Sequence, residues 1–229
     1  MPLLNIYIAR HGETDANAQR IVQGSRMNLP LNDRGRLQSE ALRREMLAKN
    51  IDWIVTSPLI RAVQTSEIVQ PHAAIPNTVD PRLTETSLGI ADGLPVAIGR
   101  PLFLPVLAQW DMGNFDARVP GGDSLSECSE RVSAAFENIL WEAVRKGYPN
   151  ILLCVHGGTM CAIMAALVAR DLCKLNMYPH ANCAYHHVTV EVPEYTSDTD
   201  IDIEKLEFVP VAICVKSHLE DAGLAEHQL

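Results

Sequence analysis

The chain has 229 residues, of which 47% are hydrophobic and 21% charged, and its formal net charge is −9. This composition is typical of a globular protein with a sizeable apolar core. The negative charge argues against broad electrostatic attraction to nucleic acid or to an anionic membrane surface, so any positive charge that attracts an anionic ligand must be local.

Cysteine usage and the N-terminal residues indicate the compartment. The six cysteines form no C-x-x-C pair and lie mostly in apolar runs, a pattern that favours reduced, buried thiols over a disulfide framework. The N-terminal residues lack a basic region and a small-residue cleavage site, and the first apolar run stops at Arg10. We therefore expect a cytoplasmic protein with neither a nucleic-acid nor a membrane partner.

The first third of the chain alternates between apolar runs and amphipathic stretches. Residues 4–9 are expected to form a buried strand, and residues 33–49 carry apolar side chains at helical spacing. Residues 52–56 are typical of a second buried strand. Ser57-Pro58 then offers an N-cap and a proline at the first position of a helix over 59–69.

The middle of the chain is rich in proline. Residues 70–105 contain six prolines and are expected to be irregular apart from one short strand, covering part of a site. Residues 124–146 show a strong amphipathic pattern and are expected to form a long helix.

Strand and helix patterns alternate again toward the C-terminus. Residues 151–155 are typical of a third buried strand, and a helix over 160–170 is expected to follow. Residues 187–192 and 205–211 are expected to form two late strands, and the segment 217–229 a helix or a loose tail.

This alternation predicts an α/β fold: a three-layer sandwich with a mostly parallel central sheet of about six strands and helices on both faces. No internal repeat or linker divides the chain. We therefore expect a single domain over residues 1–229, with 86–123 as a substrate-covering insertion and 217–229 as a C-terminal tail.

Three of the expected strands end in residues suited to binding a phosphate group. The first ends in Arg10-His11-Gly12, the second leads into Ser57 and Arg61, and the third ends in His156-Gly157-Gly158. Ligands bind at the carboxyl ends of strands in open α/β sheets. If the three strands are neighbours, two histidines and two arginines meet at one rim of the sheet.

The chemistry of this cluster follows from its side chains. Guanidinium groups bind phosphate oxygens bidentately, helix N-termini add N–H donors, and a glycine such as Gly157 lets the main chain approach an anion. A neutral imidazole is a nucleophile toward phosphorus, and Arg10 and Arg61 disfavour the imidazolium form of His11. Glu85, in a loop after a short strand, is the best candidate for a general acid that protonates a leaving alcohol.

Further segments accompany these residues in a fixed order. They are Arg10-His11-Gly12-Glu13-Thr14 with Asn17, Gln23-Gly24, Pro30-Leu31 with Gly35, Thr56-Ser57-Pro58-Leu59 with Arg61, Ala62, Gln64 and Thr65, Leu83 and Glu85 with Gly89 and Gly93, Pro120-Gly121-Gly122-Asp123-Ser124 with Arg131, and Val155-His156-Gly157-Gly158. Together, over roughly residues 4–170, they resemble the histidine phosphatase superfamily, also called the phosphoglycerate mutase-like family.

The resemblance implies an enzyme with a phosphohistidine intermediate on His11. It implies that Arg10, Arg61 and His156 hold the phosphate and that Glu85 handles the proton. Secondary contacts to the phosphate or the substrate are implied for three further residues, Asn17, Gln23 and Gly24. A phosphatase of this family is expected to use no metal ion and no organic cofactor.

Two features of the sequence bear on the substrate. Cofactor-dependent phosphoglycerate mutases carry a long insertion after the catalytic glutamate, whereas only 70 residues separate Glu85 from His156 in this chain. The segment 21–31 is similar to family members that act on fructose bisphosphates. The resemblance therefore favours the phosphatase and fructose-bisphosphatase-like branch over the mutases.

The function expected from these patterns is hydrolysis of a small phosphorylated metabolite, with sugar phosphates and bisphosphates among the candidates. Two alternatives stay open: a phosphoglycerate mutase dependent on 2,3-bisphosphoglycerate, and a non-catalytic interaction module on the same fold. A metal-dependent hydrolase is disfavoured, because Arg10 and Arg61 would repel a cation. A homodimer is compatible with the sequence, and Asn182 is a candidate to approach the site. The other histidines are interpreted as surface or structural residues: His72, His180, His186, His187, His218 and His227.

Overall fold

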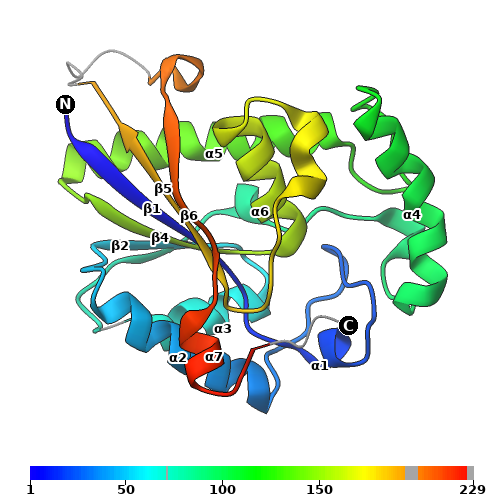
Figure 1. Cartoon of the computed structure of the whole chain (residues 1–229), viewed down its shortest axis with the longest axis horizontal. Coiled ribbons are helices and arrows are strands. Elements are labelled where there is room, and N and C mark those ends of the chain that lie inside the picture. Colours follow the sequence, from blue (N-terminus) through cyan, green and yellow to red (C-terminus); the bar gives the residue numbers. More distant parts are fainter. Residues whose placement is uncertain (71, 194–200, 226–229) are drawn as a thin grey trace.

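A six-stranded sheet forms the centre of the computed structural model, which describes residues 1–70, 72–193 and 201–225 (Figure 1). The strands are β1 (Leu3–Arg10), β2 (Trp53–Thr56), β3 (Asn77–Val79), β4 (Asn150–Val155), β5 (Tyr185–Glu191) and β6 (Phe208–Val215). They lie in the order β3-β2-β4-β1-β5-β6; the first four are parallel to one another, β5 is antiparallel to β1, and β6 is antiparallel to β5. The prediction of a mostly parallel sheet of about six strands is confirmed.

Helices cover both faces of this sheet (Figure 1). The helices are α1 (Asp15–Ala18), α2 (Asp33–Leu47), α3 (Ile60–Val69), α4 (Val96–Asp111), α5 (Leu125–Lys146), α6 (Gly157–Ile163) and α7 (Ser217–Asp221). Helices α5 and α6 pack on one face of the sheet, and α2, α3 and α7 on the other. Short 3-10 segments lie at 81–83, 89–91, 172–177 and 203–205, and a π-helical turn follows α6 at 164–168. Within residues 1–70, 72–193 and 201–225, none of the helices has the length and apolar character needed to cross a bilayer.

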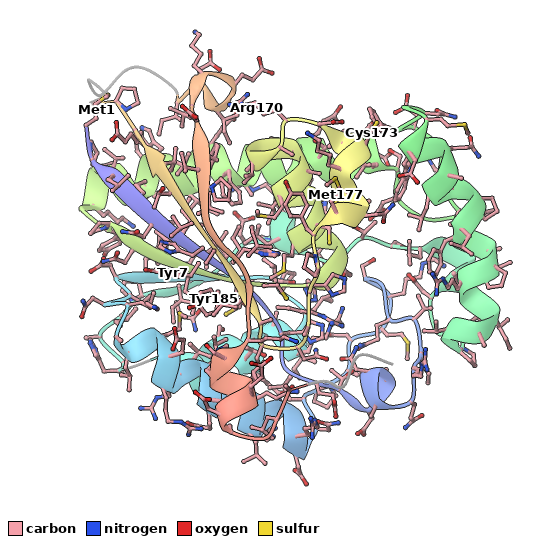
Figure 2. All side chains as sticks on the ribbon, viewed as in Figure 1. Met1, Tyr7, Arg170, Cys173, Met177 and Tyr185 are labelled. Carbon is pink, nitrogen blue, oxygen red and sulfur yellow. The ribbon has the colours of Figure 1, made fainter. Side chains whose placement is uncertain are left out.

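The central strand β1 is buried on both faces, as expected for a strand in the parallel part of such a sheet. Ile6 and Ile8 point into a core that α5 and α6 complete. Tyr7 points into the opposite core, which includes residues of α2, α3 and α7, and its ring lies 6.0 Å from that of Tyr185 (Figure 2). The two cores confirm the three-layer arrangement predicted from the alternating pattern.

The register of the parallel strands brings their carboxyl ends level. Arg10 of β1 lies opposite Val155 of β4, and Thr56 of β2 lies opposite Cys154. The residues that follow each strand therefore meet at one rim of the sheet, as the sequence predicted.

The predicted boundaries of four elements are wrong. Helix α3 begins at Ile60 with Leu59 as its N-cap, so Ser57 does not cap it; the Ser57 hydroxyl lies 2.7 Å from His156 Nε2. Helix α6 begins at Gly157, three residues before the predicted start, since the chain turns directly from β4 into the helix. Strand β5 is Tyr185–Glu191 where 187–192 was predicted, and β6 is Phe208–Val215 where 205–211 was predicted.

The largest departure from the prediction is helix α4. The segment up to Pro105 was expected to be irregular, yet α4 runs from Val96 to Asp111 with Pro101 and Pro105 inside it. Each proline lacks the amide that would donate to the carbonyl four residues earlier. Burial of Val106 and Trp110 against the neighbouring core compensates for these lost hydrogen bonds, so tertiary packing overrides local propensity.

The C-terminal segment was expected to form a helix or a loose tail. Its first residues form the short helix α7 against α2, and residues 224 and 225 accept hydrogen bonds from Arg34. The rest of that prediction, residues 226–229, lies outside the described residues.

Candidate active site

The two histidines that follow β1 and β4 meet at the rim of the sheet. The rings of His11 and His156 lie with their centroids 5.2 Å apart, and both side chains are buried. The backbone amide of His11 donates to the carbonyl of Val155, which links the two strand ends directly. The predicted convergence of the three strand ends is therefore present in the structure.

The hydrogen bonds of His11 fix its tautomer. Its Nδ1 lies 2.7 Å from the carbonyl oxygen of Gly12, which can only accept, so Nδ1 carries the proton. Its Nε2 lies 3.2 Å from Arg61 Nε, which can only donate, so Nε2 carries the lone pair. His11 is thus a neutral imidazole with its basic nitrogen turned toward a guanidinium group.

Packing around Gly12 requires a residue without a side chain. A Cβ atom at Gly12 would lie 2.5 Å from the carbonyl oxygen of Gly35, at the start of α2. The amide of Gly12 donates to Thr65 Oγ1 on α3. Helices α2 and α3 therefore hold the turn that presents the imidazole of His11.

Arg61 is buried, with a relative exposure of 1%, and main-chain carbonyls hold it. Its Nη1 donates to Met27 at 2.7 Å and its Nη2 to Gly24 at 2.9 Å. In the part of the chain that the structure describes, no carboxylate forms an ion pair with it. Burial lowers the pKa of Arg61 to about 10, so the group remains a cation at neutral pH and its charge is available to an anionic ligand.

His156 lies beside His11 but behind the surface of the pocket. Its Nε2 is 2.7 Å from Ser57 Oγ, and its Nδ1 contacts no hydrogen-bond partner among the described residues. Unlike the other predicted site residues, it does not line the pocket directly. A contact between His156 and a phosphate group therefore remains a prediction.

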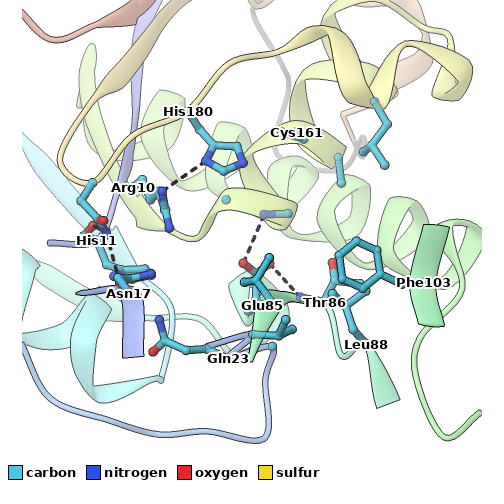
Figure 3. A pocket seen from close by; sticks show the side chains of 18 of the residues that line it. Arg10, His11, Asn17, Gln23, Glu85, Thr86, Leu88, Phe103, Cys161 and His180 are labelled. Carbon is cyan, nitrogen blue, oxygen red and sulfur yellow. Dashed lines mark hydrogen bonds between the residues drawn. The ribbon is translucent and has the colours of Figure 1, made fainter. Parts of the chain in front are cut away.

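Glu85 lies against the N-terminus of α6 (Figure 3). Its carboxyl group accepts hydrogen bonds from the amides of Gly158 at 3.1 Å and Thr159 at 2.9 Å, and from its neighbour Thr86 at 2.9 Å. Helix α6 was expected to offer its N–H groups to a bound anion. Two of these donors instead hold Glu85 in the pocket, where it faces the space beside Arg10 and His11.

Arg10 lines the pocket on the side of β5. Its Nη1 lies 3.3 Å from His180 Nδ1 (Figure 3), and its buried Nε contacts no partner among the residues that the structure describes. His180 was interpreted as a surface or structural residue; it is exposed, and its ring also packs over Gly157 and lines the pocket.

Three polar residues complete the wall near His11. Asn182 donates to the carbonyl of His11 at 2.8 Å, which confirms its expected approach to the site. Asn17 accepts from the amide of Thr14 and lines the pocket. Gln23 is buried, and its Oε1 has no partner within the described ranges. Together with Gly24 and Gly157, which also line the pocket, these residues form a polar end around His11.

The model of the histidine phosphatase superfamily (branch 1) matches residues 6–199. A curated relative, "Probable phosphoglycerate mutase GpmB" of Yersinia enterocolitica, is 30% identical over 179 residues, or 78% of either chain.

The chain belongs to the histidine phosphatase superfamily.

Solved structures share the fold of this histidine phosphatase over nearly its full length. "Mycobacterial hydrolase 2" superposes with a TM-score of 0.79 at 23% identity and covers 100% of both chains. A mycobacterial glucosyl-3-phosphoglycerate phosphatase superposes with a TM-score of 0.76 at 23% identity, over 93% of this chain and 99% of that one. Family membership confirms the resemblance seen in the motifs and the prediction of an enzyme of the histidine phosphatase class.

Burial and positive charge keep both site histidines neutral. Burial lowers the pKa of His11 well below its usual range, and Arg61 and then Arg10 lower it further. The pKa of His156 is lowered in the same way, by burial first and then by Arg61. The sequence predicted the contribution of the arginines, but desolvation is the larger cause.

These lowered pKa values predict that acid destabilises this histidine phosphatase. Below an ordinary histidine pKa of about 6.5, the unfolded chain takes up protons on His11 and His156 that the folded state does not bind. The free energy of unfolding should therefore fall by up to about 1.4 kcal/mol per pH unit for each such histidine as the pH drops below 6.5.

Urea unfolding at pH 7, 6 and 5 measures this slope. On unfolding at acid pH, the His11→Gln variant should take up close to one proton fewer than the wild type. Equal slopes for the variant and the wild type between pH 6.5 and 5 would contradict the assignment of a neutral, buried His11.

The far end of the pocket has a different character from the polar end. The cavity has a volume of about 1010 Å³ and extends from His11 past Glu85 to helix α4. Beyond Glu85 it is lined mainly by apolar side chains: Leu88, Val96, Phe103, Leu107, Trp110, Leu125, Ala162 and Leu175. Five of these residues lie in the expected substrate-covering insertion, 86–123, but the proline-rich pattern concealed the helix that carries four of them.

Proposed function

We propose that the protein is a phosphomonoesterase that hydrolyses a small phosphorylated metabolite through a phosphohistidine intermediate at His11 Nε2. One observation carries this proposal: a neutral imidazole, its Nδ1 bound to the Gly12 carbonyl, turns its lone pair toward the buried guanidinium of Arg61. The cation can bind a phosphoryl oxygen while the adjacent nitrogen attacks phosphorus. Membership of the histidine phosphatase superfamily supports the same reaction.

In the first step, a phosphate oxygen replaces His11 Nε2 as the acceptor of the hydrogen bond from Arg61 Nε, which frees the Nε2 lone pair. A bond forms between Nε2 and phosphorus while the bond from phosphorus to the alcohol oxygen breaks. Glu85 donates a proton to the departing alcohol. Arg10 and Arg61 stabilise the negative charge on the transferring group.

In the second step, water attacks the phosphorus of phosphohistidine and the nitrogen–phosphorus bond breaks. Glu85, now a carboxylate, accepts the proton from the water. His11 returns to the neutral form with its proton on Nδ1, and inorganic phosphate leaves. Each group thus ends the cycle in the state in which it began.

The acid role of Glu85 predicts a dependence on the leaving group. The Glu85→Gln variant should hydrolyse alkyl phosphates roughly 10² to 10⁴-fold more slowly, because an alkoxide needs a proton to leave. Hydrolysis of p-nitrophenyl phosphate should suffer much less, since nitrophenolate leaves without one. Steady-state kcat/KM for both substrates measures the difference.

The matched control is Glu13→Gln, which changes another carboxylate of the pocket wall, one that pairs with Arg34 at 3.4 Å. This variant should affect the two substrate types to the same extent. Equal losses on both substrates in Glu85→Gln would remove Glu85 from the acid role.

A phosphoglycerate mutase is the second candidate, and the identity to a curated relative of that name favours it. Such an enzyme would need a bisphosphate to phosphorylate His11 and would exchange 2- and 3-phosphoglycerate. Adding 2,3-bisphosphoglycerate and following that exchange separates the two candidates. The short interval between Glu85 and His156 supports the phosphatase.

We further propose a single cytoplasmic domain. Both cores lie on opposite faces of one sheet, which supports one folding unit. Cys128, Cys154, Cys161 and Cys173 carry free thiols, which supports a reducing compartment.

A further inference from the structure

The side chains at the apolar end of the pocket are held in place by packing and by a hydrogen bond. Phe103, Leu107 and Trp110 follow one another at helical spacing on one face of α4. Trp110 is buried, and its Nε1 donates to the carbonyl of Ala117 at 2.8 Å. Phe103 and Leu107 pack against the core that Trp110 belongs to while remaining half-exposed on the pocket side.

Residues from other elements continue this surface across the pocket. We call the set the outer wall: Leu88, Phe103, Leu107, Trp110, Leu125 and Leu175. Figure 3 shows Phe103 and Leu88 on the opposite side of Glu85 from His11 and Arg10. A phosphate held at His11 therefore directs the rest of its molecule past Glu85 toward the outer wall.

Charge is distributed unevenly between the two ends of the pocket. The lysine and arginine side chains that line it in the described chain are Arg10, Arg20, Arg34 and Arg61, all from its first third. No lysine or arginine lines it from residue 85 onward, within the ranges that the structure describes. None of the six outer-wall residues is charged, so a second phosphate or a carboxylate placed directly against them would lose its hydration without gaining a charged partner among them; Arg20, whose carbonyl accepts from the amide of Val96, lies at the start of α4 instead.

We propose that the outer wall binds the organic part of the substrate, and that this part is an uncharged, predominantly apolar alkyl or aryl group. This inference rests on the proposed phosphomonoesterase function and names the class of ester it acts on. Half-exposed apolar side chains in a concave pocket gain free energy when an apolar ligand removes them from water. Bisphosphates and 3-phosphoglycerate, which carry a second anionic group, fit this end poorly.

A series of straight-chain alkyl phosphates from ethyl to hexyl tests the inference, because their leaving alcohols have similar basicity. With the wild-type chain, kcat/KM should rise up to about fourfold for each added methylene group that the outer wall covers, and on the order of 100-fold across the series. Glucose 6-phosphate, 3-phosphoglycerate and fructose 1,6-bisphosphate should all be poorer substrates than hexyl phosphate.

Two variants and one control connect the preference to the outer wall. Phe103→Ala and Leu107→Ala should each reduce the hexyl-to-ethyl ratio of kcat/KM by roughly tenfold, since each removes part of the apolar contact. Leu104→Ala changes a side chain of the same helix that is 44% exposed and lies outside the pocket, and it should leave the ratio unchanged. Thermal unfolding of all three confirms that they fold.

The outcomes separate this inference from the proposed function. A rising series that flattens in Phe103→Ala and Leu107→Ala supports the inference. Hydrolysis without dependence on chain length, or a preference for 3-phosphoglycerate or the bisphosphate, overturns it and leaves the phosphatase function standing. Absence of hydrolysis on every phosphomonoester, p-nitrophenyl phosphate included, overturns both.

Discussion

Replacing His11 by alanine should lower kcat/KM for p-nitrophenyl phosphate by roughly 10⁴-fold or more, because no other group in the pocket can take its place. Removal of a catalytic nucleophile typically has an effect of this size or larger. The second histidine cannot substitute, since His156 lies behind the pocket surface with its Nε2 against Ser57. Brief incubation with labelled substrate and rapid denaturation should also trap an acid-labile phosphoenzyme in the wild type and none in the variant.

A second histidine variant controls for general effects of losing an imidazole. His187 lies on β5 outside the pocket, where its ring stacks on Tyr7 at a centroid distance of 4.4 Å. His187→Ala should lose stability but keep kcat/KM within about twofold of the wild type. Activity of His11→Ala within tenfold of the wild type would reject the phosphohistidine mechanism.

Replacing Arg61 by alanine should lower kcat/KM by roughly 10³-fold and also destabilise the fold. The catalytic loss follows from removing a buried cation that stabilises the transferring phosphoryl group. The loss of stability, about 1–3 kcal/mol in the free energy of unfolding, follows from leaving the carbonyls of Gly24 and Met27 without their donor. Steady-state kinetics and urea unfolding measure the two effects separately.

Further variants distinguish the position of Arg61 from its charge. Arg61→Lys keeps a cation but cannot contact His11, Gly24 and Met27 at once, so most of the catalytic loss should persist. Because Arg61 helps to lower the pKa of His11, the acid limb of the pH–rate profile should move to higher pH in Arg61→Ala.

The control for Arg61 is Arg145→Ala, which removes an exposed arginine that pairs with Glu142 on α5. This change should alter neither kcat/KM nor the pH profile. Full activity in Arg61→Lys would show that a point charge suffices and that the fixed guanidinium geometry is unimportant.

The polar end of the pocket could be predicted from the sequence because local patterns encode it. His11, Arg61 and His156 each follow a short apolar run, and the parallel register of β1, β2 and β4 brings them together without any information from distant loops. Glu85 was found through its place in the motif series. The hydrogen bonds that Glu85 accepts from the amides of Gly158 and Thr159 could not be predicted, because they depend on the residue at which α6 begins.

The apolar end could not be predicted, and the reason lies in α4. Pro101 and Pro105 are strong local signals against a helix, and they hid the i, i+4, i+7 spacing of Phe103, Leu107 and Trp110. The position of His180 in the pocket could not be predicted for a different reason. It lies in an irregular segment and reaches Arg10 only because β5 runs antiparallel beside β1.

The hydrogen bond from His11 Nδ1 to the Gly12 carbonyl has a consequence for the lifetime of the intermediate. Once Nε2 carries the phosphoryl group, a proton that stays on Nδ1 leaves the ring positively charged, and a charged ring departs from phosphorus far more readily than a neutral one would. The Gly12 carbonyl thereby stabilises the positively charged form of the ring, which is the better leaving group from phosphorus. In the proposed mechanism, the carbonyl that orients the ring for attack also keeps the covalent enzyme short-lived, and the imidazole serves both half-reactions without a change of orientation.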